Sequence, residues 1–119
     1  MLLAAVFAFG PVSEVDRYPE SIFPAGRTAS LTEIRLRSPI HWLEAISTPT
    51  YVIEGRAEPS NIDELDEICR RVRNTQVHCV RVPGATHFSV LERVGRVLGP
   101  RLAAGTAEGE LLGERDFGS

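Results

Sequence analysis

The sequence predicts an α/β fold: a three-layer fragment in which a short, mostly parallel sheet of about three strands is flanked by helices. Three short apolar runs, at residues 4–9, 50–54 and 76–82, are separated by stretches with helical periodicity. Parallel strands need a crossover connection, so this alternation is typical of a parallel sheet. Glycine or proline bounds each run and limits it to strand length.

Composition and charge restrict the class of protein. The 119 residues make one domain, and 43% apolar with 24% charged residues is ordinary for a globular chain rather than a disordered one. The net charge of −3 gives no basic surface field, so nucleic acid is not expected as a partner. Every basic side chain is arginine, a bias that we attribute to codon usage.

The first apolar run is expected to be a strand buried on both faces, closed by Gly10 and Pro11. The N-terminus lacks a charged segment and a small-residue cleavage site, and it is too short to span a bilayer. A buried strand is therefore favoured over a signal peptide, and no membrane partner is expected. The third run alternates apolar and polar residues, as an edge strand should.

The connection at residues 11–36 is irregular, proline-containing and long, which is typical of a lid or binding loop. A first helix is predicted to start at Ser38, with Pro39 in its first turn, and to end at residues 47–49. Within it, Trp42 is expected to pack in the core or under the lid-like loop.

Two further helices are predicted, at residues 61–73 and from residue 88 to about residue 102. Asn61 and Glu64 are spaced as in a capping box, with Ser60 as an alternative cap. The first domain boundary then falls after residue 102. The rest, residues 103–119, is rich in Gly, Ala and Glu and is expected to be a flexible tail.

The cysteines and histidines carry no metal-site signal. Cys69 and Cys79 do not make a disulfide framework and are expected to be small buried hydrophobes, with a cytoplasmic, reduced setting as the default. A zinc site from these and His41, His78 and His87 lacks the close ligand pairs of structural sites. No metal or cofactor is expected.

The segment around His87 has the strongest functional pattern. A predicted strand runs into Pro83 and Gly84, then the histidine, then a helix, which places His87 at the carboxyl end of a strand, where open α/β sheets bind ligands. The preceding strand leads to Glu58, which would bring a carboxylate to the same edge. Two plainer interpretations stay open: His87 as a turn residue bonded to local backbone, and Glu58 as a solvated loop acid.

The order and spacing of these pieces resemble the C-terminal part of α/β-hydrolase proteins, closest to the prolyl oligopeptidase and dienelactone hydrolase types. The resemblance covers roughly residues 1–102. The segments that carry it are Ala4 to Val12, Arg37-Ser38-Pro39-Ile40-His41-Trp42-Leu43, Pro49-Thr50-Tyr51-Val52-Ile53-Glu54-Gly55 and Gly84-Ala85-Thr86-His87-Phe88.

The resemblance implies a catalytic triad in the chain order serine, acid, histidine. His87 matches the family's histidine, and Glu58 fills the place of the acid, with Asp63 as the alternative; aspartate is commoner at that place. No G-x-S-x-G occurs in the chain, and none of its serines has the strand–turn–helix setting of the nucleophile. The nucleophile and the oxyanion donors would lie upstream of Met1.

The implied function is the C-terminal segment of a serine hydrolase, of peptidase or esterase type, inactive alone and acting on an ester or peptide only with the missing half. The alternatives are a non-catalytic remnant or interaction module, and an independent α/β domain that merely looks similar. In the family's sheet order, the first strand here would expose an apolar edge, and such edges pair with something. A homo-oligomer or a partner chain at that edge is therefore expected.

Overall fold

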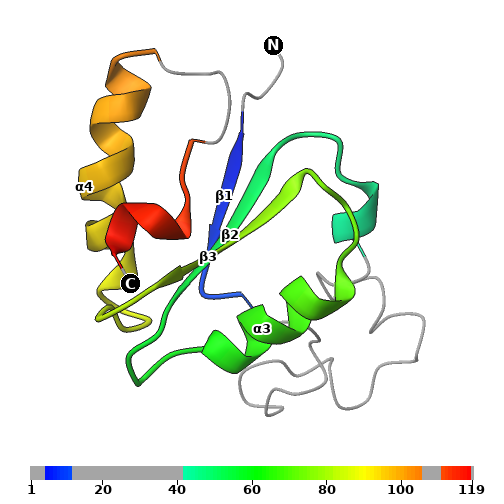
Figure 1. Ribbon diagram of the computed structural model, residues 1–119, viewed down its shortest axis with the longest axis horizontal. Helices are drawn as coiled ribbons and strands as arrows, with labels where there is room; N and C mark the ends of the chain where they lie inside the picture. The colour runs from blue at the N-terminus through cyan, green and yellow to red at the C-terminus, as the bar shows by residue number, and fades with distance from the viewer. Residues whose placement is uncertain (1–4, 12–41, 106–110, 119) are drawn as a thin grey trace, which may run out of the picture.

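The computed structural model describes residues 5–11, 42–105 and 111–118. Its centre is a parallel sheet of three strands, β1 (Val6–Phe9), β2 (Thr50–Gly55) and β3 (Val77–Val82), in the order β1-β2-β3 (Figure 1). The pairing is in register from Val6 with Thr50 and from Thr50 with Val77. All carboxyl ends therefore meet at one edge of the sheet, and the predicted parallel α/β architecture is confirmed.

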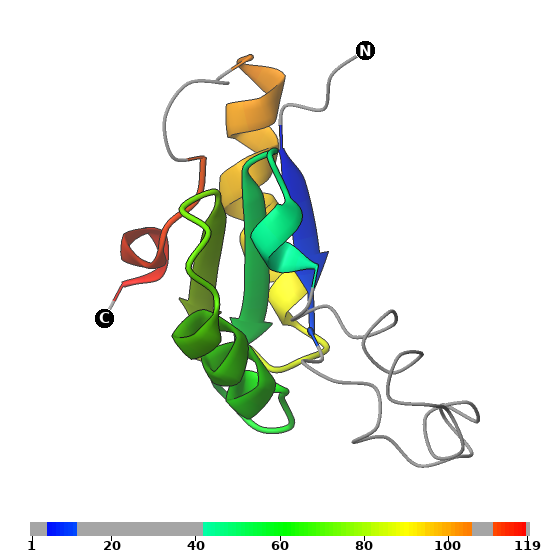
Figure 2. The same cartoon turned by 90° about the vertical axis from the view of Figure 1, so that its right-hand side faces the viewer.

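Two helices cover the sheet from opposite faces, as Figures 1 and 2 show. They are α3 (Ile62–Arg71), which connects β2 to β3, and α4 (Val90–Ala103), which follows β3. Two short 3-10 turns, η3 (Leu43–Ala45) and η4 (Glu114–Phe117), complete the described elements.

The period-2 alternation of the strands divides the core between these two helices. Towards α4, the sheet presents Tyr51, Ile53, Val80 and Val82, which pack against Val90, Val94, Leu98, Leu111 and Leu112. The other face carries a second, smaller cluster, in which Ile68 of α3 packs with Leu43 of η3. Burial of these side chains from water is what holds the three layers together.

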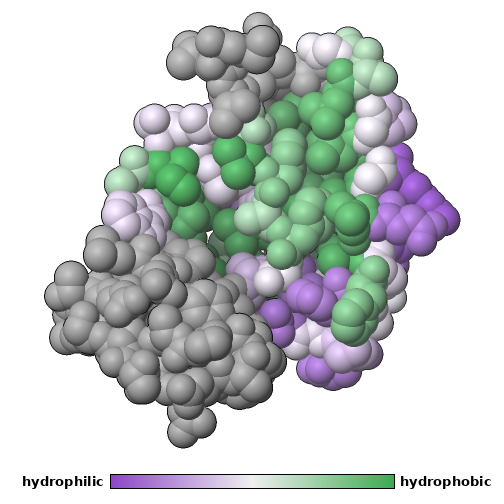
Figure 3. All heavy atoms as spheres, turned by 180° about the vertical axis from the view of Figure 1, so that it is seen from behind, coloured by the Kyte–Doolittle hydropathy of each residue, from purple (hydrophilic) through white to green (hydrophobic). Residues whose placement is uncertain are grey.

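The first strand differs from its prediction. Val6 and Ala8 are exposed, so β1 is not buried on both faces. Among the described residues β1 pairs with β2 alone, which leaves its outer edge without a partner there. This edge lies on the back of the molecule, where Figure 3 shows a broad apolar area.

The end of the chain is packed rather than flexible over residues 111–118. Leu111 and Leu112 are buried, and the backbone N–H of Leu111 donates to the hydroxyl of Tyr51 at 2.8 Å. The expectation of a flexible tail is wrong here, because two adjacent leucines complete the core against β2 and α4. Mean composition concealed this pair within a polar, glycine-rich stretch.

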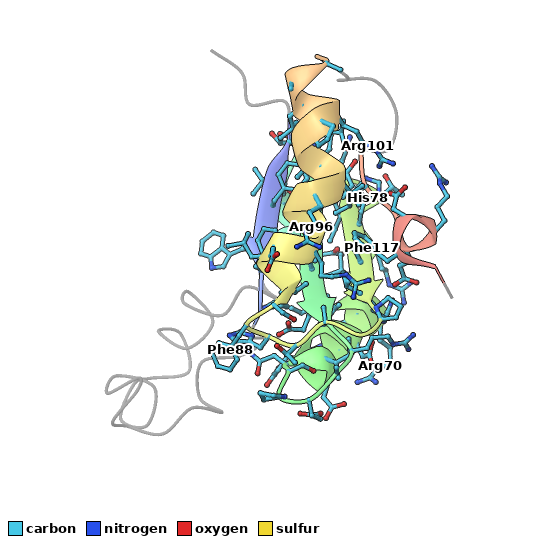
Figure 4. The ribbon with its side chains drawn as sticks, turned by 90° about the vertical axis from the view of Figure 1, so that its left-hand side faces the viewer. Arg70, His78, Phe88, Arg96, Arg101 and Phe117 are labelled. Carbon is cyan, nitrogen blue, oxygen red and sulfur yellow. A yellow bond between two sulfur atoms is a disulfide. The ribbon has the colours of Figure 1, made fainter. Side chains whose placement is uncertain are left out.

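A part-buried ion pair also holds residues 111–118 in place. Arg101 of α4 donates to both carboxylate oxygens of Asp116, at 2.9 and 2.7 Å (Figure 4 labels Arg101). This bidentate bond lowers the pKa of Asp116 to about 2, and the backbone N–H of Gly113 also donates to the carboxylate.

The cysteines are also unlike their prediction. Cys69 of α3 and Cys79 of β3 form a disulfide, and both are partly exposed. A helix residue and a strand residue can meet in this way because α3 lies flat on the face that Cys79 points to. A disulfide between neighbouring elements stabilises the fold chiefly by restricting the unfolded chain.

Some predictions fall outside the described residues: the lid-like loop at residues 11–36 (beyond Pro11), and the start of the first helix at Ser38 with His41. From residue 42 onward that helix is a single 3-10 turn, and Trp42 is half exposed, at 49%, rather than a core residue. Among the described residues, no helix combines the length and the apolar character needed to cross a membrane.

Candidate functional site

His87 lies in the loop between β3 and α4, at the carboxyl edge of the sheet. Gly84 turns the chain with a positive φ of 76°, a conformation that glycine adopts without strain. Two reciprocal bonds then start α4: Thr86 N–H donates to Ser89 Oγ at 2.8 Å, and Ser89 N–H donates to Thr86 Oγ1 at 3.2 Å. These bonds satisfy backbone donors at the helix start and fix the loop that carries the histidine.

The imidazole of His87 meets the carboxylate of Glu54. Its Nδ1 lies 2.9 Å from Oε2 of Glu54, which is a hydrogen-bond distance. Glu54 is 0% exposed, whereas the side chain of His87 is 36% exposed. The pair therefore combines a fully buried acid with a histidine that solvent can reach.

The buried carboxylate has two further donors. The backbone N–H of Gly55 donates to Oε1 at 2.8 Å, and that of Asn61 donates to Oε2 at 2.9 Å. A buried carboxylate is costly unless such bonds compensate its lost hydration. Glu54 is thus held from the strand end, from the start of α3 and from the histidine.

The loops after β2 and β3 are tied together by backbone bonds. His87 N–H donates to Pro59 O at 2.8 Å, and Ala57 N–H donates to Ala85 O at 2.9 Å. Gly55 permits this approach, because a Cβ there would lie 2.1 Å from the carbonyl oxygen of Ala85. The site is therefore built on paired backbone rather than on free loops.

The predicted acids do not occupy this position. Glu58 is exposed, and its carboxylate accepts the N–H of Ser60 at 3.2 Å. Asp63 is exposed in the first turn of α3, where it complements the helix dipole. The structure brings Glu54, and not Glu58 or Asp63, to Nδ1 of His87. Glu58 is not the partner of the His87 ring in this structure, because its side chain is exposed and accepts the N–H of Ser60 instead.

A sequence signal for Glu54 existed. It is a carboxylate within an apolar run, Thr50–Gly55, that is expected to be buried, and a buried charge requires a partner. The resemblance instead predicted the acid in the loop after the strand, at Glu58. Which partner Glu54 would take could not be read from the sequence, because His87 is 33 positions away.

An exposed aromatic ring stands beside the histidine. Phe88 is 80% exposed, and its ring meets that of His87 edge to face, with centroids 5.2 Å apart at 89°. Figure 4 shows Phe88 projecting outward at the end of the molecule where the strand arrows end. An apolar group bound next to His87 would therefore find a surface to pack against.

The geometry assigns chemical roles to the two ring nitrogens. Only a protonated Nδ1 can donate to a carboxylate, so the neutral ring has its acceptor at Nε2. That nitrogen can take a proton from a hydroxyl placed beside it, while the hydrogen bond to Glu54 holds the ring in place. An imidazole oriented in this way can act as a general base.

His78 is the other histidine among the described residues. His78 stacks on Tyr51, with ring centroids 4.8 Å apart, and points to the face opposite its neighbour Cys79. Over the described parts of the chain, no group of three or more His, Cys, Asp or Glu side chains could hold a metal ion.

Comparison with known proteins adds no identification: no family model, no curated protein and no solved structure matches this chain.

Proposed function

We propose that this chain is the acid–histidine part of a serine hydrolase of peptidase or esterase type, with Glu54 as the acid and His87 as the general base. The observation that carries the proposal is the 2.9 Å contact between Nδ1 of the accessible His87 and the fully buried Glu54. A histidine that merely closed a turn would not require a buried carboxylate behind it. The fold and the resemblance add the expected place, the carboxyl edge of a parallel sheet.

In the proposed reaction, Nε2 of His87 takes the proton of a serine hydroxyl as its oxygen attacks the carbonyl carbon of an ester or amide. The same nitrogen then gives the proton to the leaving oxygen or nitrogen as the bond to the carbonyl carbon breaks. Glu54 accepts the hydrogen bond from Nδ1 and keeps the ring in one orientation. The sequence contains no serine in the elbow pattern, so the hydroxyl comes from polypeptide outside these 119 residues.

The outer edge of β1 is the proposed place of junction with that polypeptide. Its backbone groups face no other strand among the described residues, and Val6 on it is 36% exposed. A further strand of the hydrolase sheet would pair there and cover the apolar area of Figure 3. The second candidate function, an interaction module without chemistry, rests on this edge alone.

The test uses the native polypeptide in its source cells. An antibody against residues 42–105 isolates it after treatment with a serine-reactive fluorophosphonate. The proposal predicts label on the isolated polypeptide or on a chain bound to it, loss of label in His87→Ala, and strong reduction in Glu54→Ala. Glu58→Ala is the matched control and keeps the label. Absence of label, or label that survives His87→Ala, contradicts the hydrolase proposal, and a stable unlabelled complex favours the interaction module.

The cytoplasmic location expected from the sequence stays a prediction. The Cys69–Cys79 bond weighs against it, since disulfides form and persist mainly in oxidising compartments. Alkylation of the native polypeptide at lysis, before any reduction, distinguishes the two compartments. Cysteines that do not react with the alkylating reagent are in the disulfide and indicate an oxidising compartment, whereas alkylated cysteines indicate a reducing compartment.

A further inference from the structure

The end of β1 approaches the imidazole of His87 more closely than a side chain would allow. Gly10 follows Phe9 at the carboxyl edge of the sheet, and its N–H donates to Ile53 O at 3.0 Å. A Cβ at Gly10 would lie 2.3 Å from Cε1 and 2.8 Å from Nδ1 of His87. Real Cβ atoms do not approach other atoms this closely, so the ring occupies the space that a side chain would need.

We propose that Gly10 is a positioning residue for His87. The bare backbone of Gly10 forms one wall of the imidazole site, the ring of Phe88 lies edge-on beside it, and Glu54 binds Nδ1. Any residue other than glycine at position 10 displaces the ring from Glu54. The catalytic meaning of this role rests on the proposed function, whereas the placement of the ring does not.

Gly10 also has a positive φ of 62°, so a substitution there strains the backbone as well as meeting the ring. The chain offers a control for that strain. Gly105 has a φ of 73°, and a Cβ there would meet nothing within 4 Å. Gly105→Ala thus carries the backbone penalty of Gly10→Ala without the steric contact.

The experiment records the imidazole nitrogen signals of the full chain by NMR, with His87 identified by the loss of its signals in His87→Ala. The wild-type chain and Gly105→Ala are expected to give the same His87 pattern, with the proton on Nδ1. Gly10→Ala is expected to lose that pattern and to give signals that exchange between the two tautomers. Superimposable His87 signals in Gly10→Ala and Gly105→Ala overturn the inference.

A double-mutant cycle keeps the inference testable if Gly10→Ala unfolds at low denaturant. The shift of the urea midpoint caused by Gly10→Ala is expected to be smaller in a His87→Ala background, where the ring is gone, and to approach the shift of Gly105→Ala. Equal shifts in both backgrounds contradict the contact. If the His87 signals move as expected but the native polypeptide takes no fluorophosphonate, the positioning role stands and the hydrolase proposal fails.

Discussion

Replacing Glu54 by alanine is expected to cost about 3 kcal/mol of folding free energy. The substitution removes the acceptor of three hydrogen bonds, from Gly55 N–H, Asn61 N–H and His87 Nδ1, at 2.8, 2.9 and 2.9 Å. A buried donor left without an acceptor costs roughly 1–3 kcal/mol, and a part-buried donor costs less. The Gly55 bond is buried and those from Asn61 and His87 are part-buried, so the three together cost several kcal/mol. Release from the desolvation of a fully buried carboxylate offsets part of this sum, which leaves about 3 kcal/mol.

Urea unfolding followed by far-UV circular dichroism measures this loss. For a protein of this size, a slope of about 1.5 kcal/mol per M converts 3 kcal/mol into a midpoint lower by about 2 M. Glu58→Ala is the matched control, because that carboxylate is exposed and bonds only locally, and its free energy of unfolding is expected to stay within about 0.5 kcal/mol of the wild type.

Glu54→Gln separates shape from charge. The amide keeps one oxygen acceptor but turns N–H donors toward Asn61 N–H and His87, so an intermediate midpoint and a changed His87 tautomer are expected. Equal midpoints for Glu54→Ala and Glu58→Ala would refute the reasoning, since a buried acceptor of three bonds cannot be as dispensable as an exposed one.

Three further outcomes are expected. The pKa of Asp116 lies at about 2 in the fold, below its ordinary 3.8, so its bond to Arg101 stabilises the protein fully above pH of about 4 and is lost as the pH falls towards 2. The difference in free energy of unfolding between wild type and Asp116→Asn, on the order of 1 kcal/mol after allowance for solvent screening, should close over that window, and a constant difference would contradict this. The Cys69–Cys79 bond joins cysteines 10 positions apart, and its reduction should lower the free energy of unfolding, measured in urea, by about 2–3 kcal/mol. An unchanged free energy would show that the disulfide does not stabilise the fold. Leu112→Ala should lower the free energy of unfolding by about 2–5 kcal/mol because the side chain is fully buried. An unchanged free energy of unfolding would support the original expectation of a flexible tail.

Local pattern was sufficient for the elements of the sheet. The runs predicted at residues 50–54 and 76–82 correspond to β2 and β3 within a residue at each end, because period-2 patterns and flanking glycine or proline are local signals. Helix α3 is two residues shorter at its end than predicted, since the chain is already extended at Val72. The N–H of Ile62 is bonded to Ser60 Oγ, the alternative cap, and Asn61 makes no side-chain cap bond.

Contacts between segments far apart in the chain could not be predicted from the sequence. Each partner of the C-terminal segment looks ordinary by itself: a tyrosine in a strand, an arginine in the last turn of α4, a leucine pair in a polar stretch. Their value for folding arises when they meet, and no spacing rule relates Tyr51 to Leu111 across 60 positions. The cysteine pair belongs to the same class, since a disulfide depends on where two elements cross.

The sequence by itself determined the parallel α/β class, the places of the strands and the turn that carries His87, because these depend on patterns within a few residues. The tertiary structure alone decided which acid stands behind that histidine. Strand register sets Glu54 at the buried end of β2, whereas the side chain of Glu58 in the following loop is exposed. Gly10 closes the imidazole site from a third segment. Three side-by-side parallel strands bring these groups together at one edge, and that meeting is a property of the folded sheet rather than of any stretch of chain.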